Sequence, residues 1–481
     1  MILGGASTAG AATITVDTAV DQAGAASSCS LRNAVIAADQ DVAAGGCAAG
    51  SGDDLIEVPP GSYELSLSGA DENLGVSGDL DLRGPGAVTI EPSSAAGGVV
   101  IDGLNLDRVI HLAGGSLALR DMTLTHGSSI GTVDPYGGAI YVSSGALTLD
   151  GVLVRDSRSE LGGALYNGGN ANLVNSTLSG NRATTYGGGI VAAIGSQTVL
   201  RSVTVAFNHA DSDASGDGDG GGLFAPSESV EMTNSILADN LDDSPTGNLS
   251  LPDCTAGSGF QPRFVISTQD LGCHLGADPG VSNQSPADPL LLPLADNDGP
   301  TFTHALGTGS PALNAGGATA PDQCPATDQR GRTRPAGECD LGAYEFVPKP
   351  PDPDPDPDPE PLPGMANPTK TTATYDGKNL HIRLKCPARF KPKCISTAVP
   401  VTKRKGGKAM AKLKKVVTRA NGWKRVTFLI KPAFRQKVMA MTFVDRKQLV
   451  TRQKIKSKRV GKRRAKRPAT VFHTYKVRVK A

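Results

Sequence analysis

Three aspartates in the first half of the chain have the residue type that glycan hydrolysis requires. Asp121, Asp150 and Asp156 lie near equivalent positions of a repeated pattern, and Arg155 stands beside the third. A glycoside hydrolase uses two carboxyl groups about 5 to 9.5 Å apart, one as the acid and one as the base or nucleophile. These four residues are the predicted catalytic candidates, and a solvated charged face is the alternative interpretation.

A second stretch, DSDASGDGDGGG from position 211 to 222, has the residue types of a calcium loop. Its oxygen-bearing residues are Asp211, Asp213, Ser215, Asp217 and Asp219. The spacing of the first three matches positions 1, 3 and 5 of an EF-hand loop, but position 12, which takes a bidentate Glu in that motif, is Gly222. A calcium site outside the EF-hand class and a solvated acidic turn are the two interpretations.

A column of aromatic residues is the third feature with a chemical use. Each follows an aliphatic residue that recurs along the chain, and its members are Tyr141, Tyr166 and Phe224. If the aliphatic residues face inward, the period of two in a strand turns the aromatic rings outward, where they can stack on sugars or a partner. If the register is reversed, the rings belong to the core.

Other catalytic signatures are missing. His111, His126 and His209 are scattered without zinc-like spacing, and no GxSxG nucleophile motif occurs. The motifs of pectate lyases and polygalacturonases are absent as well.

The elements that must position these residues are short repeats. GGAIYV at Gly137 returns as GGALYN at Gly162, GGGIVA at Gly187 and GGGLFA at Gly220, with periods of 25, 25 and 33 residues. Between them lie short apolar runs with period two, such as LTLDGVLV, which indicate strands without intervening helices. Repeats of this length bury their apolar faces only by stacking on their neighbours. We therefore predict an all-β chain that coils as a parallel β-helix.

An asparagine follows the apolar runs at a constant offset. Asn181, Asn208 and Asn240 each stand three residues after the last apolar residue of a repeat. Asparagine tolerates the left-handed backbone conformation, and stacked amides can bond to each other from coil to coil. We predict a structural asparagine ladder at one corner.

Several motifs resemble known families. The GGAI repeats resemble those of polymorphic outer-membrane proteins, which lie on right-handed parallel β-helices. CSLRNAVIAAD, from Cys29, resembles the CSLREA domain, with Asn33 in place of the family's Glu. PLADNDGPTFTHAL, GSPALNAG, CPATDQRGRTRP and CDLGAYEF resemble the choice-of-anchor Q domain. The resemblance implies a secreted bacterial protein on a right-handed parallel β-helix whose molecular activity the families leave unassigned.

Charge divides the chain into two unlike parts. Residues 1–364 hold 13 basic and 45 acidic residues, whereas residues 365–481 hold 35 basic and 2 acidic ones. The alternating Pro and Asp at the end of the first part favour an extended polyproline II spacer, with a floppy tether as the alternative. The predicted divisions are a signal-peptide-like segment (1–12), a CSLREA-like cap with the first coils (13–79), β-helix repeats (80–250), a choice-of-anchor Q-like C-terminal cap (251–347), a Pro/Asp linker (348–364) and a small basic β-rich domain with a basic C-terminal arm (365–481).

The basic domain predicts a polyanionic partner. Charge of this density attracts envelope polymers, acidic lipid headgroups or nucleic acid. An envelope polyanion is favoured because nucleic-acid binding usually interleaves aromatic residues for stacking, and this segment has few. Neutralisation of the acidic part of its own or a neighbouring chain is a further alternative.

Eight cysteines form four sequence-local couples. The couples are Cys29 with Cys47, Cys254 with Cys273, Cys324 with Cys339, and Cys386 with Cys394. An even number in local couples without CxxC spacing predicts disulfides, and therefore an oxidising exterior. No apolar run reaches 18 residues, so we expect no transmembrane span.

Together these features predict a secreted or cell-surface β-helix that adheres or displays a surface without catalysis, held on the envelope by its basic domain. Its partner is expected to be a cell-envelope polyanion or a surface glycan. The alternatives are a polysaccharide lyase or glycoside hydrolase on the β-helix face, and a nucleic-acid or matrix polyanion binder acting through the basic domain. No cofactor other than calcium is predicted.

Overall fold

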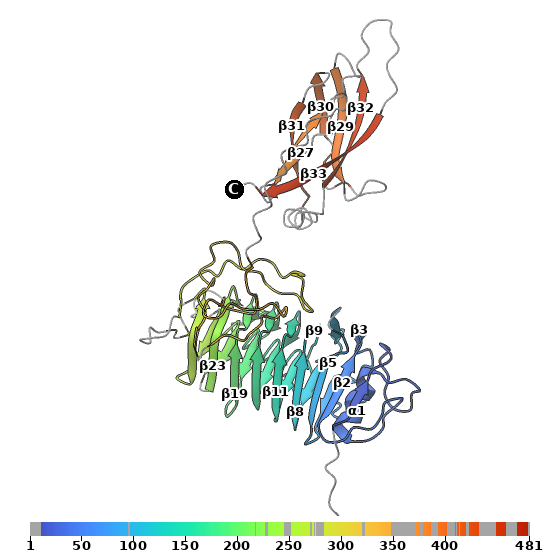
Figure 1. Cartoon of the computed structure of the whole chain (residues 1–481), viewed down its shortest axis with the longest axis vertical. Coiled ribbons are helices and arrows are strands. Elements are labelled where there is room, and N and C mark those ends of the chain that lie inside the picture. The colour runs from blue at the N-terminus through green and yellow to red at the C-terminus, as the bar shows by residue number, and fades with distance from the viewer. Residues whose placement is uncertain are drawn as a thin grey trace, which may run out of the picture. The chain divides into compact units, whose positions relative to one another are not determined.

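The computed structural model describes residues 11–347, with gaps at 95–96, 217, 227–228, 245–251, 270–271, 274, 276–282 and 320–322, and seven strands with a few adjoining residues between 371 and 479. The chain divides into two compact units, Met1–Pro348 and Lys349–Ala481. The described chain is nearly all β, with large parallel sheets, as the repeats predict (Figure 1).

In the first unit, each turn of the chain adds one strand to each of several parallel stacks. One turn runs through β10 (Ile140–Val142), β11 (Ala146–Asp150), β12 (Leu153–Arg155) and β13 (Arg158–Ser159), and β14 (Leu165–Asn167) then pairs in parallel with β10. Such a coil of parallel strands has the topology of a β-solenoid. Its right-handed sense stays a prediction.

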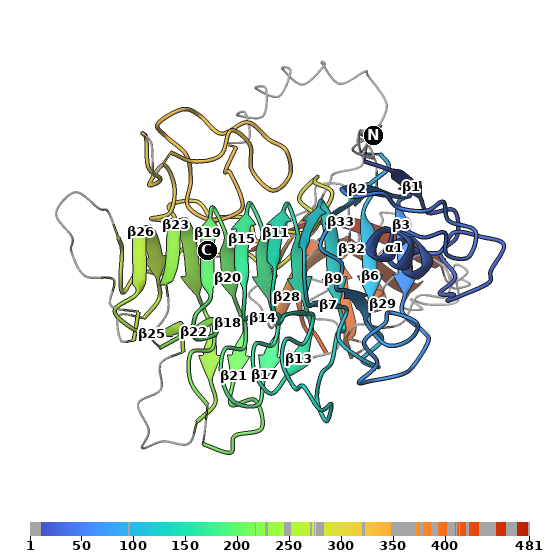
Figure 2. The same ribbon diagram turned by 90° about the horizontal axis from the view of Figure 1, so that it is seen from below.

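Three parallel sheets result from this stacking. Figure 2 shows how the strands of successive coils follow one another in each sheet. The short sheet contains β4 (Leu80–Leu82), β7 (Ile110–Leu112), β10, β14, β18 (Ile190–Ala192), β22 (Leu223–Ala225) and β25 (Cys254–Ala256). A four-stranded sheet contains β13, β17 (Arg182–Ala183), β21 (His209–Ala210) and β24 (Leu241–Asp242).

The third, 15-stranded sheet bends once in each coil. Its first stack is β1 (Thr13–Thr15), β2 (Asp54–Val58), β5 (Ala87–Pro92), β8 (Ser116–Arg120), β11, β15 (Asn170–Val174) and β19 (Gln197–Arg201). Its second stack is β3 (Gly61–Glu64), β6 (Val99–Asp102), β9 (Met122–Thr125), β12, β16 (Thr177–Ser179) and β20 (Thr204–Ala206). The longer strands β23 (Ser229–Ala238) and β26 (Phe260–Ser267) belong to both.

Backbone conformation sets the corners of each coil. The residue at the bend between the two stacks has positive φ in successive coils: Asp121, Gly151, Asn175, Ser202 and Asn234. The first glycine of each repeated pair, such as Gly137 (φ 64°), is also left-handed, and a Cβ there would lie 2.0 Å from the carbonyl oxygen of Ile140. Only glycine fits this corner without strain.

A ladder of buried asparagines crosses the coils at the next corner. Asn181 donates through Nδ2 to Oδ1 of Asn208 (2.9 Å), and Asn208 donates in the same way to Asn240 (3.0 Å). Asn240 in turn donates to the carboxylate of Asp253 (3.0 Å), and at the other end the amide of Ser157 donates to Asn181. All three asparagines are 3% exposed or less, so the ladder satisfies polar groups inside the core.

The first coil is closed by α1 (Leu31–Gln40), the only helix in the described part of the chain. The all-β prediction missed it, because its small apolar residues give a short helical period inside a strand-rich sequence. Ser30 caps the helix by accepting a hydrogen bond from the amide of Asn33, and Asp41 ends it in the left-handed conformation. The helix buries Leu31 and Val35 against the end of the coil.

The segment predicted as a C-terminal cap splits into two parts. Its beginning supplies β25 and β26 of the last described coil, whereas residues 283–319 and 323–347 return along one side of the bent sheet (Figure 1). This side segment reaches back several coils: Thr301 donates to the carbonyl of Gly151 (3.0 Å) and the amide of Ala343 donates to Thr204 (3.0 Å). It therefore covers a flank of the coil rather than its end.

A buried arginine organises the side segment. The guanidinium of Arg334 is 5% exposed and contacts the carboxylate of Glu345 and the carbonyl oxygens of Asp340 and Gly342. Arg330 pairs with Asp328 at 2.6 Å. The residues of the DQRGRTRP and LGAYEF motifs thus hold this segment together, so their role here is structural.

Three of the four predicted disulfides are present: Cys29–Cys47, Cys254–Cys273 and Cys324–Cys339. Cys386 lies outside the described residues and the side chain of Cys394 is not described, so the fourth couple stays a prediction.

The second unit contains one seven-stranded sheet. Its strands are β27 (Thr371–Tyr375), β28 (Asn379–Lys385), β29 (Lys393–Val401), β30 (Lys414–Arg419), β31 (Trp423–Leu429), β32 (Leu449–Ser457) and β33 (Ala469–Val479). All pairings are antiparallel except that of β27 with β33. The predicted Pro/Asp linker and the basic stretch 458–468 lie outside the described residues.

The ladder generates a stability prediction. Asn208→Ala removes both the donor to Asn240 and the acceptor for Asn181, and it leaves buried amide and carbonyl groups without partners. Each such group costs about 1–3 kcal/mol, so we expect a loss of at least about 2 kcal/mol in the free energy of unfolding, measured with urea. Asn172→Ala, at an exposed position on β15, is the matched control and should change stability by less than about 0.5 kcal/mol. Equal effects of the two variants would contradict the ladder's role.

The side segment generates a pH prediction. His304 lies buried between Phe207 and Ser179, and burial lowers its pKa from 6.5 to about 4, although a hydrogen bond to the carbonyl of Leu292 opposes the shift. Because the folded pKa lies below the unfolded one, the stability from neutral His304 is complete above pH 6.5. It is lost as the pH falls toward 4, by roughly 3 kcal/mol.

We therefore expect the difference in unfolding free energy between wild type and His304→Gln to shrink as the pH falls from 7 to 4. Both proteins contain the same buried carboxylates, so the effect of these groups on the pH dependence of stability cancels in the difference. His126→Gln, which removes a side chain that is 40% exposed, is the control for loss of an imidazole. A difference that stays constant with pH would show that His304 does not titrate in this way.

Candidate binding site on the short parallel sheet

The outer face of the short sheet carries one in-register column of side chains. Parallel pairing places Asp81 beside His111, His111 beside Tyr141, Tyr141 beside Tyr166, and one coil further on Val191 beside Phe224. The residues that flank Tyr141 in β10, Ile140 and Val142, are fully buried. Alternation along the strand therefore turns the column outward, and this decides between the two registers that the sequence left open.

Five half-buried rings make up what we call the aromatic strip: Tyr136, Tyr141, Tyr166, Tyr186 and Phe224. Tyr136, from the corner before β10, stacks on Tyr166 with ring centroids 4.5 Å apart and also contacts Tyr141 at 5.4 Å. Tyr186, from the equivalent corner two coils further on, stacks on Phe224 at 4.3 Å. The corner residues fix the rings of the sheet residues, so the strip is a preformed apolar surface.

Charged groups close one end of the strip. His111 stacks on Tyr141 with the rings 4.8 Å apart and nearly parallel, and the guanidinium of Arg108 lies 5.5 Å from the centre of the same Tyr141 ring. Arg108 pairs through Nε with Asp79, and both are almost completely buried. A third carboxylate, Asp107, accepts from the backbone amide of Arg108 (2.8 Å).

This buried cluster contains more acid than base. Asp79 Oδ1 and Asp107 Oδ2 are buried without a hydrogen-bond partner. Burial raises the pKa of Asp79 well above its usual range, the charge of Asp81 raises it further, and Arg108 opposes both. The pKa of Asp107 is raised as well, mainly by burial. Asp79, Asp81 and His111 form the only group of three metal-type ligands within 4.8 Å of one another in the described residues.

Two buried arginines hold the backbone around the site. Arg108 donates to the carbonyl oxygens of Asp134 (2.9 Å) and Tyr136 (3.3 Å), which places the Tyr136 ring over the strip. Arg32 of α1 pairs with Asp21 and donates to the carbonyl oxygens of Gly75 and Asp79. It thereby positions the loop whose Gly75 amide donates to Asp81.

His111 joins three coils through both ring nitrogens. Its Nδ1 lies 3.0 Å from Oδ1 of Asp81 on β4, and its Nε2 lies 3.0 Å from Oγ of Ser143, just after β10. The second oxygen of Asp81 accepts the Gly75 amide at 2.9 Å. His111 is 6% exposed and Asp81 3% exposed, whereas Ser143 is half-buried.

Of the predicted catalytic residues, the structure brings two together. Asp121 occupies a bend of the 15-stranded sheet, and its amide donates to the carbonyl of Asp150 (2.9 Å). Burial raises the pKa of Asp121 to about 6, with the charges of Asp150 and Glu91 adding to the shift and Arg120 opposing it. The pKa of Asp150 is also raised, mainly by burial.

The other two predicted catalytic residues lie apart from this pair. Arg155 ends β12 and Asp156 follows it; the two pair with each other at 2.7 Å and are partly exposed. This exposed ion pair agrees with the alternative interpretation of these residues as part of a solvated charged face.

The acidic loop uses its first carboxylate for its own turn. Asp211 accepts hydrogen bonds from the amides of Ser215 (2.8 Å) and Gly216 (2.9 Å) and from the Ser215 hydroxyl. Burial acts to raise its pKa, but these hydrogen bonds outweigh burial and lower it. Asp213 and Asp219 do not join it as a three-ligand group, and Asp217 lies outside the described residues, so the calcium site stays a prediction.

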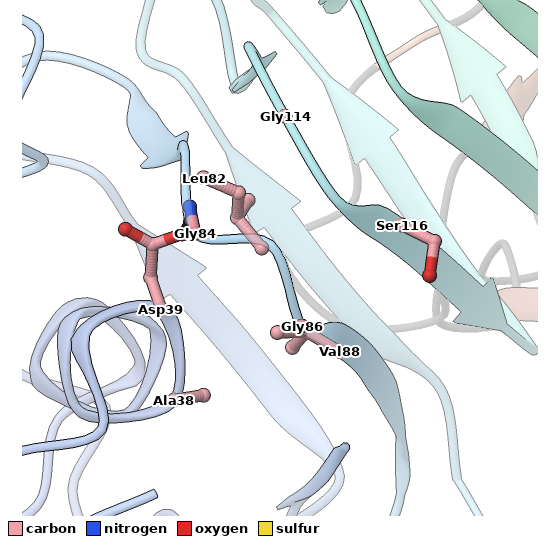
Figure 3. Close-up of a pocket in the computed structure, with 8 residues that line it drawn as sticks. All are labelled: Ala38, Asp39, Leu82, Gly84, Gly86, Val88, Gly114 and Ser116. Carbon is pink, nitrogen blue, oxygen red and sulfur yellow. Dashed lines mark hydrogen bonds between the residues drawn. The ribbon is translucent and has the colours of Figure 1, made fainter. Parts of the chain in front are cut away.

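A small crevice lies between the C-terminal end of α1 and the turns of the first coils (Figure 3). It has a volume of only about 10 Å³ for water-sized molecules and is lined mostly by glycines and small side chains, with Asp39 as its only ionisable residue. Asp39 already accepts from the amides of Arg83 and Gly84. The crevice is smaller than most ligand pockets and offers no free charge.

Comparison of the chain with protein-family models, with curated proteins and with solved structures finds no match. The resemblances to CSLREA and choice-of-anchor Q proteins therefore stay predictions. No helix in the described part of the chain is long and apolar enough to cross a membrane.

Sequence reasoning missed the charged end of the strip. Asp79, Arg108 and Ser143 belong to no repeated motif, and His111 has no partner at a zinc-like spacing in the sequence. The available signal was positional: Asp81 and His111 occupy the outward slot of the short strands that Tyr141 and Tyr166 occupy in later coils.

Proposed function

We propose that the protein is a secreted, surface-displayed right-handed parallel β-helix that binds a neutral glycan along the aromatic strip. The supporting observation is that the half-buried rings of Tyr141 and Tyr166 are in register on adjacent coils, with the stacked rings of Tyr186 and Phe224 further along the same face. Tyr141 and Tyr166 lie on adjacent coils of the short sheet, and their ring centroids are 5.6 Å apart with the two ring planes at 75° to each other. Aromatic rings exposed on neighbouring coils can stack on the apolar faces of successive sugar rings.

The negative charge of the first unit affects which glycans can bind to the strip. Residues 1–364 carry 32 more acidic than basic residues, and Asp134 lies close enough to raise the pKa of Tyr141, to which burial contributes most. A polyuronate would be repelled by this surface. The strip therefore favours a neutral polysaccharide.

The basic segment 365–481 supports the idea of retention on an anionic surface. Its 35 basic and 2 acidic residues attract envelope polyanions, and nucleic acid remains the alternative partner. In this proposal the acidic unit carries the binding strip while the basic unit holds the protein near the cell.

Removal of two rings tests the strip. We expect Tyr141→Ala/Tyr166→Ala to weaken binding to a neutral polysaccharide at least tenfold, measured by affinity electrophoresis or calorimetry on a glycan panel. Phe302→Ala, which removes an exposed ring from the opposite flank, should leave binding unchanged. Thermal melting of each variant checks that it is folded. Binding that is insensitive to the double variant, or absent from every neutral glycan, would contradict the proposal.

A second candidate function is glycan hydrolysis by Asp121 and Asp150, favoured by the raised pKa of Asp121 beside a second carboxylate. In glycoside hydrolases one carboxyl group is protonated and acts as the acid, while a second is charged and acts as the base or nucleophile. Asp121 and Asp150 resemble such a pair. Since the acid must be protonated, activity should fall as the pH rises through about 6.

The release of new reducing ends from neutral polysaccharides measures this second activity. Asp121→Asn should abolish it, whereas Asp156→Asn, which alters the separate surface pair, should not. Equal activity of the two variants, or no turnover by folded protein on any substrate, would remove this candidate.

A further inference from the structure

We propose that Ser143, His111 and Asp81 form a nucleophilic triad that hydrolyses carboxylic esters. Three successive coils supply one residue each, and the chain of hydrogen bonds is continuous: Ser143 Oγ to His111 Nε2, and His111 Nδ1 to Asp81 Oδ1, each at 3.0 Å. A nucleophile in contact with a base that a third group orients is the arrangement that activates a serine hydroxyl.

The environment assigns the three roles. Asp81 is 3% exposed and its other oxygen accepts the Gly75 amide, so its carboxylate is fixed in place. An Asp81 carboxylate opposite Nδ1 keeps the proton of neutral His111 on that nitrogen, which leaves the Nε2 lone pair facing the hydroxyl of Ser143. Stacking on Tyr141 holds the imidazole ring in this orientation.

The solvent exposure of the three residues differs, and the serine, which must meet the substrate, is the most exposed. The acid and the base are nearly excluded from solvent, whereas Ser143 is half-buried and is followed by the exposed Ser144. A second acceptor for the Ser143 hydroxyl, the carbonyl of Leu112, lies farther away at 3.4 Å. The hydroxyl thus has its shorter contact with the base and can meet a substrate from the surface.

The reaction balances without any oxidant or metal. Ser143 Oγ attacks the ester carbonyl carbon while His111 Nε2 accepts the hydroxyl proton. The carbon–oxygen bond to the alcohol then breaks, and the alcohol leaves with that proton from Nε2. Water, deprotonated by Nε2, attacks the acyl-serine, the bond to Oγ breaks, Oγ regains the proton and a carboxylic acid is released.

The neighbouring strip suggests where the alcohol part of the substrate lies. Tyr141 stacks on the catalytic imidazole and begins the run of aromatic rings, so an O-acylated sugar would place its ring on the strip and its ester at Ser143. This choice of alcohol rests on the proposed glycan binding, whereas the ester cleavage itself does not. Simple probes without a sugar therefore test the triad alone.

The same residues permit a different reading, because Asp79, Asp81 and His111 lie close enough to hold a metal ion. A metal bound through Nδ1 would replace the hydrogen bond from His111 to Asp81. Loss of the activity described below on addition of EDTA, or its dependence on added zinc or calcium, would overturn the triad.

The experiment uses the full chain, a biotinylated fluorophosphonate and the substrate p-nitrophenyl acetate at pH 8. We expect the probe to label Ser143, located by mass spectrometry of the peptides, and we expect Ser143→Ala to lose the labelling and at least tenfold of the hydrolysis rate. Ser144→Ala, one residue further on, removes a hydroxyl that donates to the carbonyl of Ala113 and not to His111, and this variant should keep both.

Further variants separate a triad from a structural link between coils. Asp81→Asn should lower the rate of labelling at Ser143, because the imidazole of His111 then loses the carboxylate that orients it. If Asp81→Asn does not fold, the comparison of Ser143→Ala with Ser144→Ala still decides. No labelling of folded wild type, labelling that persists in Ser143→Ala, or equal hydrolysis by both serine variants would show that the hydrogen bonds are structural only. A triad that works on p-nitrophenyl acetate while neutral glycans fail to bind would refute the glycan proposal alone.

Discussion

In-register parallel stacking of the coils is the constraint on which the rest of this structure depends. Each strand pairs with the strand one coil before and one coil after it, so a residue position in the repeat becomes a column on the surface or a row in the core. The asparagine ladder from Asn181 to Asn240 fixes this register, because a slip would leave buried amides without partners. The aromatic strip exists only because Tyr141 and Tyr166 share a register position.

Buried arginines link the stacked coils to the irregular segments around them. Arg32 ties α1 to the loop before β4, and that loop bonds to Asp81. Arg108 ties the acidic cluster to the corner that carries Tyr136. A guanidinium can satisfy several carbonyl oxygens and a carboxylate at once, which is why it serves at places where strands end and backbone groups would otherwise be unpaired. The charged end of the binding surface therefore depends on two arginines that are almost completely buried.

The two long faces of the coil have different uses. Residues 283–347 cover part of the bent sheet through contacts such as Thr301 with Gly151, and the covering segment is held by its own buried pair of Arg334 and Glu345. The short sheet, in contrast, leaves Tyr141, Tyr166 and Phe224 half-exposed. This difference places the proposed binding strip on the short sheet. The pair of Asp121 and Asp150 lies on the bent sheet instead, so the two proposed functions are separable by mutation.

The sequence by itself determined the architecture of the repeats. The Gly pairs, the period-two apolar runs and the asparagines at constant offset identify strands, corners and the ladder, because each depends only on local conformation and on repetition. The cysteine couples likewise predicted the three disulfides that the structure describes. The repeats did not predict the helix α1, since its ten residues lie outside them and gain their stability by packing on the coil end.

The tertiary structure alone decided the chemistry. Whether Tyr141 faces the core or the outside depends on which side of β10 packs inward, and only the stacked coils settle that. Asp81, His111 and Ser143 are about thirty residues apart from one to the next in the sequence and become neighbours through two parallel pairings. Asp121 and Asp156 look alike in the sequence, yet the first lies beside the carboxylate of Asp150, which helps to raise its pKa, and the second pairs with Arg155. Distance between side chains in different coils is set by register and burial, and neither is a local property of the chain.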